Sequence, residues 1–280
     1  MVQWGCCISP WSSADGGDMP VRAEEMFAQL TDVGFEYAEL SASSLVQLSD
    51  TALSSLVRAM ERTGTPVRAC NSFVPATIPL VGPQRDFDRI HDYVGRTLTR
   101  CAQIGAGTVV FGSGTARHIP DGFDSATALR QLKEFLIMCN DFGERLRIDI
   151  VIEPLRKAEC NVINSVAQGA ALTREVNLPH IRLLADSYHM AAEQEAYGVL
   201  DGVADLLGHV HVANGRERRY PGHDRGDVED LARMFVHLQR SGYARGISVE
   251  CRFELFVKEL PKALVTLREA WATGFRLSEG

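Results

Sequence analysis

Short apolar runs alternate along this chain with longer stretches in which apolar residues recur every three or four positions. Short runs of this kind are typical of buried strands, and the longer pattern is typical of amphipathic helices. The short runs predict eight strands, at Trp4–Ser9, Tyr37–Ser41, Val67–Asn71, Thr108–Gly112, Asp149–Glu153, Ile181–Asp186, His209–Ala213 and Gly246–Glu250. The longer stretches predict helices at Ala23–Val33, Asp50–Arg62, Asp86–Ile104, Asp124–Gly143, Ser165–Val176, Glu193–Leu206, Asp227–Ser241 and Glu254–Ala272.

This regular alternation predicts an α/β fold. Strands separated by helices pair in parallel through right-handed crossovers, and eight such units close into a (β/α)8 TIM barrel. A doubly wound open sheet is the structural alternative. No Pro-, Gly- or Ser-rich linker and no block of like charges divides the chain. We therefore predict a single TIM-barrel domain over residues 1–280.

Composition narrows the class of protein. The chain has 29 Lys and Arg against 36 Asp and Glu, a net charge of −7, which disfavours general nucleic-acid binding because that needs a basic surface. The longest unbroken apolar run is Phe135–Cys139, too short for a membrane span or a signal peptide. The 7 cysteines lack zinc-site spacing and are expected as reduced thiols. We expect a soluble, cytoplasmic protein with neither nucleic-acid nor membrane partners.

Four consecutive predicted strands carry an acid or an imidazole at or near their carboxyl ends. These residues are Glu153, Asp186, His211 and Glu250. In a TIM barrel the strand ends meet at one mouth, which is where active sites lie. Three carboxylates and one imidazole brought together resist ionisation unless a cation neutralises them. The sequence therefore predicts a divalent metal site, and three oxygens with one nitrogen favour Mn²⁺, with Mg²⁺ and Co²⁺ as alternatives, over Zn²⁺.

Several motifs accompany these four residues, and together they resemble one known family. They are Glu153-Pro154-Leu155 leading to Glu159-Cys160-Asn161, Asp186-Ser187-Tyr188-His189-Met190 followed by Glu193, His209-Val210-His211 followed by Gly215-Arg216 and Pro221-Gly222, and Gly242-Tyr243 ahead of Ile247-Ser248-Val249-Glu250. The ordered set resembles the sugar phosphate isomerase/epimerase family with a xylose-isomerase-like TIM barrel. Ketose 3-epimerases and hydroxypyruvate isomerases are among its members.

The resemblance implies roles for individual residues. Glu153, Asp186, His211 and Glu250 match the family's metal ligands, and the two glutamates match its acid/base pair. Matches to substrate contacts are Glu159, His189 and Arg216. The resemblance also implies a small carbohydrate substrate and a homo-oligomer, a dimer or a tetramer.

These residue types fit proton transfer beside a carbonyl. Removing a hydrogen from the carbon next to a carbonyl leaves an enediolate, whose negative charge a divalent cation stabilises. One glutamate would remove the proton, and the other would return one on the opposite face. Epimerisation and aldose–ketose isomerisation share this intermediate, so the ligands do not distinguish them. A lyase or dehydratase acting on a keto-inositol or a 3-keto-glycoside, and a non-catalytic metal-retaining sugar-binding barrel, are alternatives.

Some polar residues allow two interpretations. His209 is either a hydrogen-bonded core histidine or a further ligand, and Glu39 either contacts a sugar or supports the site from behind. His189 could be a surface histidine, and Glu159 could cap a loop. Gly112-Ser113-Gly114 either cradles a phosphate or forms a tight turn.

The loops after the strands also contain many basic residues. If these residues face the barrel mouth, they favour a substrate with a carboxylate or phosphate group. They are Arg117, His118, Arg156, Lys157, Arg216, Arg218 and Arg219. The chain also departs from typical ketose 3-epimerases after the metal-ligand histidine: it reads Val212-Ala213-Asn214-Gly215-Arg216 and lacks their Gly-Glu step. It has no tryptophan between Trp11 and Trp271 either.

Overall fold

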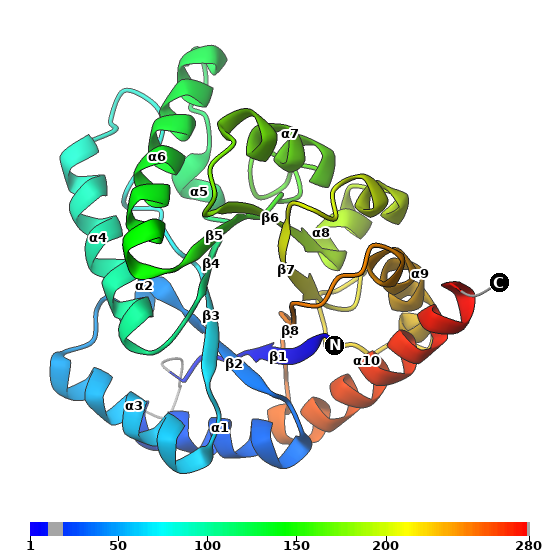
Figure 1. Ribbon diagram of the computed structural model, residues 1–280. Coiled ribbons are helices and arrows are strands. Elements are labelled where there is room, and N and C mark those ends of the chain that lie inside the picture. The colour runs from blue at the N-terminus through cyan, green and yellow to red at the C-terminus, as the bar shows by residue number, and fades with distance from the viewer. Residues whose placement is uncertain (11–18, 279–280) are drawn as a thin grey trace.

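The barrel predicted from the sequence is present. A computed structural model describes residues 1–10 and 19–278, and its eight strands form a closed parallel barrel in the order β1 to β8 (Figure 1). Each strand pairs with the next, and β8 pairs with β1. The strands are β1 (Gln3–Cys7), β2 (Tyr37–Ser41), β3 (Val67–Asn71), β4 (Thr108–Phe111), β5 (Asp149–Ile152), β6 (Ile181–Asp186), β7 (Leu207–Val212) and β8 (Gly246–Val249).

Helices surround this barrel on the outside (Figure 1). They are α1 (Met19–Val33), α2 (Ala42–Leu45), α3 (Asp50–Thr63), α4 (Phe87–Gln103), α5 (Gly114–Arg117), α6 (Ser125–Leu146), α7 (Val166–Val176), α8 (Ser187–Ala192), the 3₁₀ helix η1 (Tyr197–Gly202), α9 (Asp227–Arg240) and α10 (Phe256–Ser278). Side chains of Asp124 and Ser165 accept hydrogen bonds from backbone N–H groups in the first turns of α6 and α7. Both residues are therefore N-caps.

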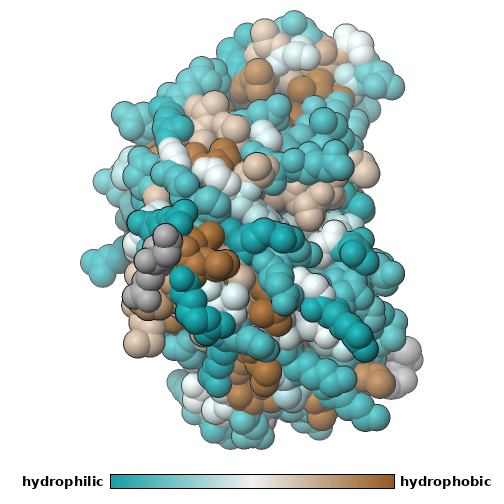
Figure 2. Space-filling view, turned by 90° about the vertical axis from the view of Figure 1, so that its right-hand side faces the viewer, coloured by the Kyte–Doolittle hydropathy of each residue, from teal (hydrophilic) through white to brown (hydrophobic). Residues whose placement is uncertain are grey.

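Alternation along the strands divides the buried residues into two groups. On β4, Val109 and Phe111 belong to the large apolar core that also includes helix residues. Between them, Val110 joins only Val151 and Leu184, on the neighbouring strands β5 and β6. Successive strand residues point to opposite faces, so this small group lies inside the barrel and the large one lies between strands and helices. The outer face seen in Figure 2 is mainly hydrophilic with scattered apolar patches.

The helix predicted at Glu193–Leu206 is wrong. The carboxylate of Asp186 accepts hydrogen bonds from the N–H groups of Tyr188 and His189, so α8 begins directly at the end of β6. It ends before Gln194, whose φ of 55° is left-handed. Gly198 and Gly202 then disfavour an α-helix, and the chain forms η1.

The carboxyl end of α6 also differs from the prediction. The helix runs past Gly143 and stops at Leu146, where Arg147 adopts the left-handed conformation that ends it. None of the helices in the described ranges is both long and apolar enough to cross a bilayer.

Candidate active site

The four predicted ligands meet at the mouth of the barrel. Asp186 ends β6, His211 lies on β7, and Glu153 and Glu250 follow β5 and β8 directly. One ligand atom from each lies within 4.8 Å of the others. His211 Nδ1 is 3.1 Å from Glu250 Oε2 and 3.4 Å from Glu153 Oε1. A register shift between Leu183 and Leu184 accompanies the pairing that sets Asp186 opposite His211.

Unpartnered polar atoms in this cluster fit a cation. Glu153 Oε1, Asp186 Oδ2 and His211 Nδ1 are all buried and lack a hydrogen-bond partner. Leaving one buried polar atom unpaired costs about 1–3 kcal/mol, so three in one place need an explanation. A divalent cation bound by these atoms would satisfy all three. The residues present therefore fit a metal of the hard, oxygen-preferring type.

A buried carboxylate holds the imidazole of His211 from behind. Glu39 Oε1 is 2.9 Å from His211 Nε2, and Glu39 Oε2 is 2.9 Å from His209 Nε2. Burial opposes ionisation of Glu39, but the two imidazoles hold its pKa well below its usual value. With Nε2 bonded to Glu39, Nδ1 of His211 is directed at the other ligands, an arrangement common behind metal-binding histidines.

This arrangement answers two questions left open by the sequence. Glu39 is fully buried and supports His211, so its carboxylate faces histidines and not a bound sugar. His209 is a hydrogen-bonded core histidine, also 3.2 Å from Ser248 Oγ. Burial lowers the pKa of His209, although Glu39 opposes the shift. The neutral imidazole is therefore favoured at this position.

The pKa values of the two glutamates of the cluster shift in opposite directions. Burial and the neighbouring charge of Glu250 raise the pKa of Glu153. Burial acts in the same direction on Glu250, but His211 and Arg218 outweigh it and lower its pKa to about 2. The pKa of His211 is raised well above its usual value, because Glu39 and Glu250 outweigh the effect of burial. Paired groups whose pKa values move apart are typical of acid/base sites.

The loop after β4 fixes the position of Glu153. A side chain at Gly112 would place its Cβ 2.2 Å from Glu153 Oε2, so only glycine leaves room for this carboxylate. Arg117 is fully buried and donates to the carbonyls of Phe111 and Glu153, at 2.9 and 2.7 Å. Arg117 is therefore bound within this loop and is not a basic residue free to meet an anionic substrate at the barrel mouth. Ser113 has a φ of 45° and its Oγ accepts a hydrogen bond from Val74 N–H, which identifies a tight turn.

A different arginine from the predicted one enters the cluster. Arg216 is exposed on the loop after β7, and the structure does not bring it to the other site residues. Arg218 Nη2 instead lies 2.5 Å from Glu250 Oε2 and 3.6 Å from Asp186 Oδ2. Arg218 has a φ of 55°, and its guanidinium also packs on the ring of Tyr188. Arg216, Arg218 and Arg219 lie within four positions of one another, and no pattern in the sequence distinguishes the one that reaches the cluster.

The other two predicted substrate contacts lie beside the cluster. His189 is buried on α8, so the surface alternative is wrong; its Nε2 has no hydrogen-bond partner and is 3.8 Å from Asp186 Oδ2. Its Nδ1 accepts a hydrogen bond from the backbone N–H of Arg156. Glu159 is partly exposed and accepts a hydrogen bond from Arg156 Nε at 2.7 Å. Arg218 Nη1 is 3.9 Å from the same carboxylate.

Most of the basic rim residues already have acidic partners. Lys157 pairs with Glu193, and Arg219 pairs with Glu254 and Glu259. These pairs neutralise charge that an anionic substrate would otherwise meet. The geometry therefore does not favour a carboxylate or phosphate substrate over a neutral one.

Comparison with known proteins identifies the family. The profile of the xylose isomerase-like TIM barrel family matches residues 27–272. The chain belongs to this family. It is 25% identical to D-psicose 3-epimerase of Agrobacterium fabrum, over 70% of this chain and 69% of that protein. It is also 25% identical to 3-dehydro-D-guloside 4-epimerase of Escherichia coli, over 83% of this chain and 88% of that protein. A solved structure of L-ribulose 3-epimerase shares the fold with a TM-score of 0.83 at 19% identity, covering 100% of this chain and 97% of that one.

Proposed function

We propose that this protein is a divalent-metal-dependent carbohydrate epimerase or isomerase that moves a proton next to a carbonyl group. The observation that carries the proposal is the pair Glu153 and Glu250. Their carboxylate oxygens lie 3.4 and 3.1 Å from the same nitrogen, His211 Nδ1, in a cluster whose unpartnered buried atoms fit a cation, and their pKa values shift in opposite directions. Two curated relatives with this family's barrel are named epimerases, which supports the same reaction type.

We infer different starting roles for the two glutamates from the opposite directions of their pKa shifts. Glu250, whose pKa is about 2, is ionised at neutral pH and is placed to accept a proton from a substrate carbon. Glu153, with its raised pKa, is the group of the pair that more readily holds a proton and returns it. A cation bound by Glu153, Asp186, His211 and Glu250 would supply positive charge that stabilises negative charge developing on substrate oxygens.

Neighbouring side chains would orient the sugar. Arg218 offers donors beside Glu250, and His189 directs its unpartnered Nε2 toward the same space as Asp186. Glu159 presents a partly exposed carboxylate that suits a sugar hydroxyl. We therefore assign substrate contact to Arg218, His189 and Glu159, with Arg218 in the place expected for Arg216.

The metal requirement is tested by removing and restoring ions. The protein is dialysed against a chelator and then supplied with Mn²⁺, Mg²⁺, Co²⁺ or Zn²⁺. The donor set of three oxygens and one nitrogen favours the first three, and Mn²⁺ is the ion we propose. Calorimetric titration measures each affinity. Failure of the chelated protein to take up any of these ions would overturn the proposed metal site.

The reaction is tested with ketoses, aldoses, keto acids and keto-glycosides in D₂O with Mn²⁺. Nuclear magnetic resonance then shows which carbon acquires deuterium. We expect exchange at a carbon beside the carbonyl together with formation of an isomer. Loss of water or of an aglycone would instead identify a lyase or dehydratase. Binding without exchange would identify a sugar-binding barrel with no catalysis. The predicted dimer or tetramer is tested separately by light scattering.

A further inference from the structure

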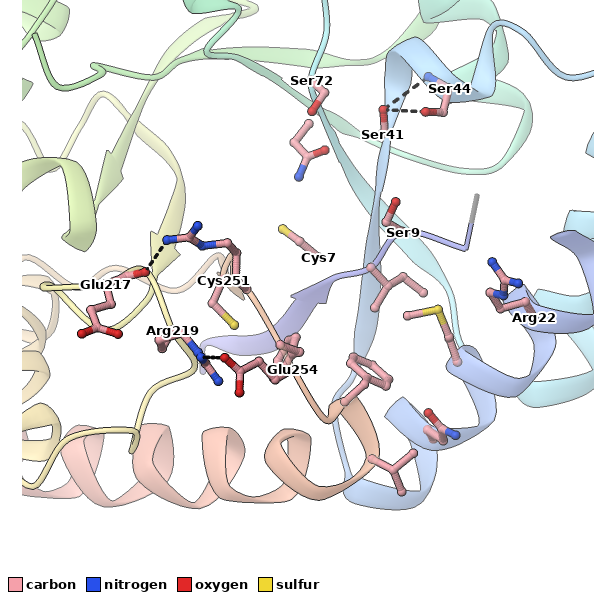
Figure 3. Close-up of a pocket in the computed structure, with 18 residues that line it drawn as sticks. Cys7, Ser9, Arg22, Ser41, Ser44, Ser72, Glu217, Arg219, Cys251 and Glu254 are labelled. Carbon is pink, nitrogen blue, oxygen red and sulfur yellow. Dashed lines mark hydrogen bonds and ion pairs between the residues drawn. The ribbon is translucent and has the colours of Figure 1, made fainter. Parts of the chain in front are cut away.

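A large cavity occupies the side of the barrel mouth away from β5 and β6. It has a volume of about 1080 Å³ and lies over the carboxyl ends of β1, β2, β3 and β8 (Figure 3). Its lining includes Cys7, Ser41, Asn71 and Val257. None of the four proposed cation ligands, Glu153, Asp186, His211 and Glu250, is among its lining residues.

The cavity borders the proposed reaction site. Asn71 lines the cavity, and its Nδ2 donates a hydrogen bond to Glu250 Oε1 at 3.3 Å. The sulfur of Cys7, another lining residue, lies within 4.8 Å of a ring nitrogen of His211. A molecule held at the cluster therefore has this cavity beside it, and a group attached to that molecule would extend into the space.

The walls of the cavity are polar on one side and apolar on another. Ser41, Ser44 and Ser72 gather on one side in Figure 3. The first turn of α10 contributes Phe256 and Val257. Phe256 packs edge-to-face on Phe253, with ring centroids 5.1 Å apart, so the apolar wall includes an aromatic pair.

Charged side chains at the cavity are largely engaged with other groups. Arg219 is paired with Glu254, and both line the cavity (Figure 3). Arg252 donates to the backbone carbonyl of Glu217, and Arg22 donates to that of Pro10. A neutral occupant with hydroxyl groups and an apolar surface suits these walls better than an anion does.

The size of the cavity sets the class of substrate. Pockets for drug-sized ligands hold about 300–1,000 Å³, so a cavity of this volume has room for a substituent that is attached to a sugar. We propose that the substrate is a keto-glycoside, in which the sugar carries a neutral, partly apolar substituent on its glycosidic oxygen. The cavity beside Asn71 binds that substituent, while the carbonyl side of the sugar faces Glu153 and Glu250. This inference rests on the proposed function for the position of the sugar.

Two valines on one helix provide a matched pair of variants. Val257 and Val265 both lie on α10 and both are 64% exposed, but only Val257 lines the cavity. Val257→Trp places a bulky ring at the cavity wall. Val265→Trp makes the same change outside the cavity and controls for any effect on folding.

Binding is measured first, with glycosides that lack a ketone and cannot react. Phenyl and methyl glycosides of glucose and galactose, in both anomeric forms, are titrated into the Mn²⁺-supplied protein by calorimetry. Burial of the phenyl ring should make one phenyl glycoside bind at least about tenfold more tightly than its methyl counterpart. Val257→Trp should change that ratio at least about fivefold in either direction, whereas Val265→Trp should leave it within about twofold. Equal affinities, no binding, or the same change in both variants would overturn the proposal.

Turnover separates failure of the cavity assignment from failure of the proposed function. Deuterium exchange is compared between a free keto-sugar and its 3-keto phenyl glycoside. We expect a kcat/KM at least about tenfold higher for the glycoside, because the substituent adds binding energy. Equal values for the two substrates would overturn the cavity assignment and leave the epimerase proposal standing. Exchange with neither would overturn the proposed function, and the calorimetric ratio would then decide the cavity assignment alone.

Discussion

The two sides of the barrel mouth differ in how their polar groups are satisfied. On the side of β5, β6 and β7, Glu153, Asp186, His189 and His211 each have a buried polar atom without a hydrogen-bond partner. On the side of β1, β2 and β3, Ser44 donates to Ser41, and Asn71 donates to Glu250. Of the described side chains that line the cavity there, only Arg219 contributes such an atom.

This difference in hydrogen bonding suits the two sides of the barrel mouth to different roles. Carboxylates and imidazoles that lose water need an outside charge, so the first side suits the proposed cation and the proposed proton transfer. On the second side hydroxyl groups bond to one another and the amide of Asn71 bonds to Glu250, so these groups need no outside charge and can adjoin part of the proposed ligand. Glu250 belongs to the boundary, because one of its oxygens faces His211 and the other accepts from Asn71.

The test with the largest expected effect removes the charge of Glu250, which lies between the two sides. Glu250→Gln should lower the rate of deuterium exchange on the order of 10²–10⁴-fold, the usual contribution of a positioned acid or base. Nuclear magnetic resonance in D₂O measures the rate. Glu175→Gln, at an exposed residue of α7 outside both the cluster and the cavity, is the control and should retain the rate within about threefold. Comparable losses in both variants would contradict the assignment.

A second test changes Glu39, which contacts His211 but lies outside the proposed substrate site. Glu39→Gln weakens the group that orients His211, and we expect Mn²⁺ affinity to fall about 10–100-fold. Calorimetric titration of the ion measures this change. Tyr37→Phe removes a hydrogen bond to Ser248 nearby and should leave the affinity nearly unchanged. A result in which Glu39→Gln binds Mn²⁺ as the wild type does would refute the supporting role.

A third test compares two arginines of one loop. A hydrogen bond to a charged group contributes about 1.5–3 kcal/mol, so Arg218→Ala should raise KM at least about tenfold. Arg216→Ala changes an exposed side chain and should alter KM less than about twofold. Steady-state kinetics on the substrate found in the D₂O panel measures both. A larger rise in KM for Arg216→Ala than for Arg218→Ala would instead identify Arg216 as the substrate contact.

The smallest effect on exchange is expected from a change on the side of the barrel mouth formed by β1, β2 and β3. Ser44→Ala removes a hydroxyl that donates to Ser41, and Ser41 keeps its bond from the backbone N–H of Ser44. We expect exchange on a free keto-sugar to change less than about twofold and the free energy of unfolding to change by about 0.5 kcal/mol or less. Urea denaturation measures the stability. A large loss of exchange would show that this side of the barrel mouth also contributes to proton transfer.

Much of the fold could be predicted because its signals are local. Strand and helix periodicity predicted the eight units, and polar residues at strand ends predicted which side chains meet at the mouth. The helix at Glu193–Leu206 failed because Asp186 starts α8 earlier and Gln194 ends it. Caps and left-handed residues depend on loop conformation, which a hydrophobic pattern does not encode. The extent of the predicted domain, residues 1–280, stays a prediction.

Sequence alone determined the barrel and the set Glu153, Asp186, His211 and Glu250, because strand direction and side-chain alternation fix where those residues point. Tertiary structure decided that Glu39 bridges His209 and His211, which lie 170 and 172 positions further along the chain. It also placed Arg218, and not Arg216, beside Glu250. Packing across a closed barrel and the backbone angles of a long loop set these contacts. No short stretch of the sequence specifies this packing or these angles.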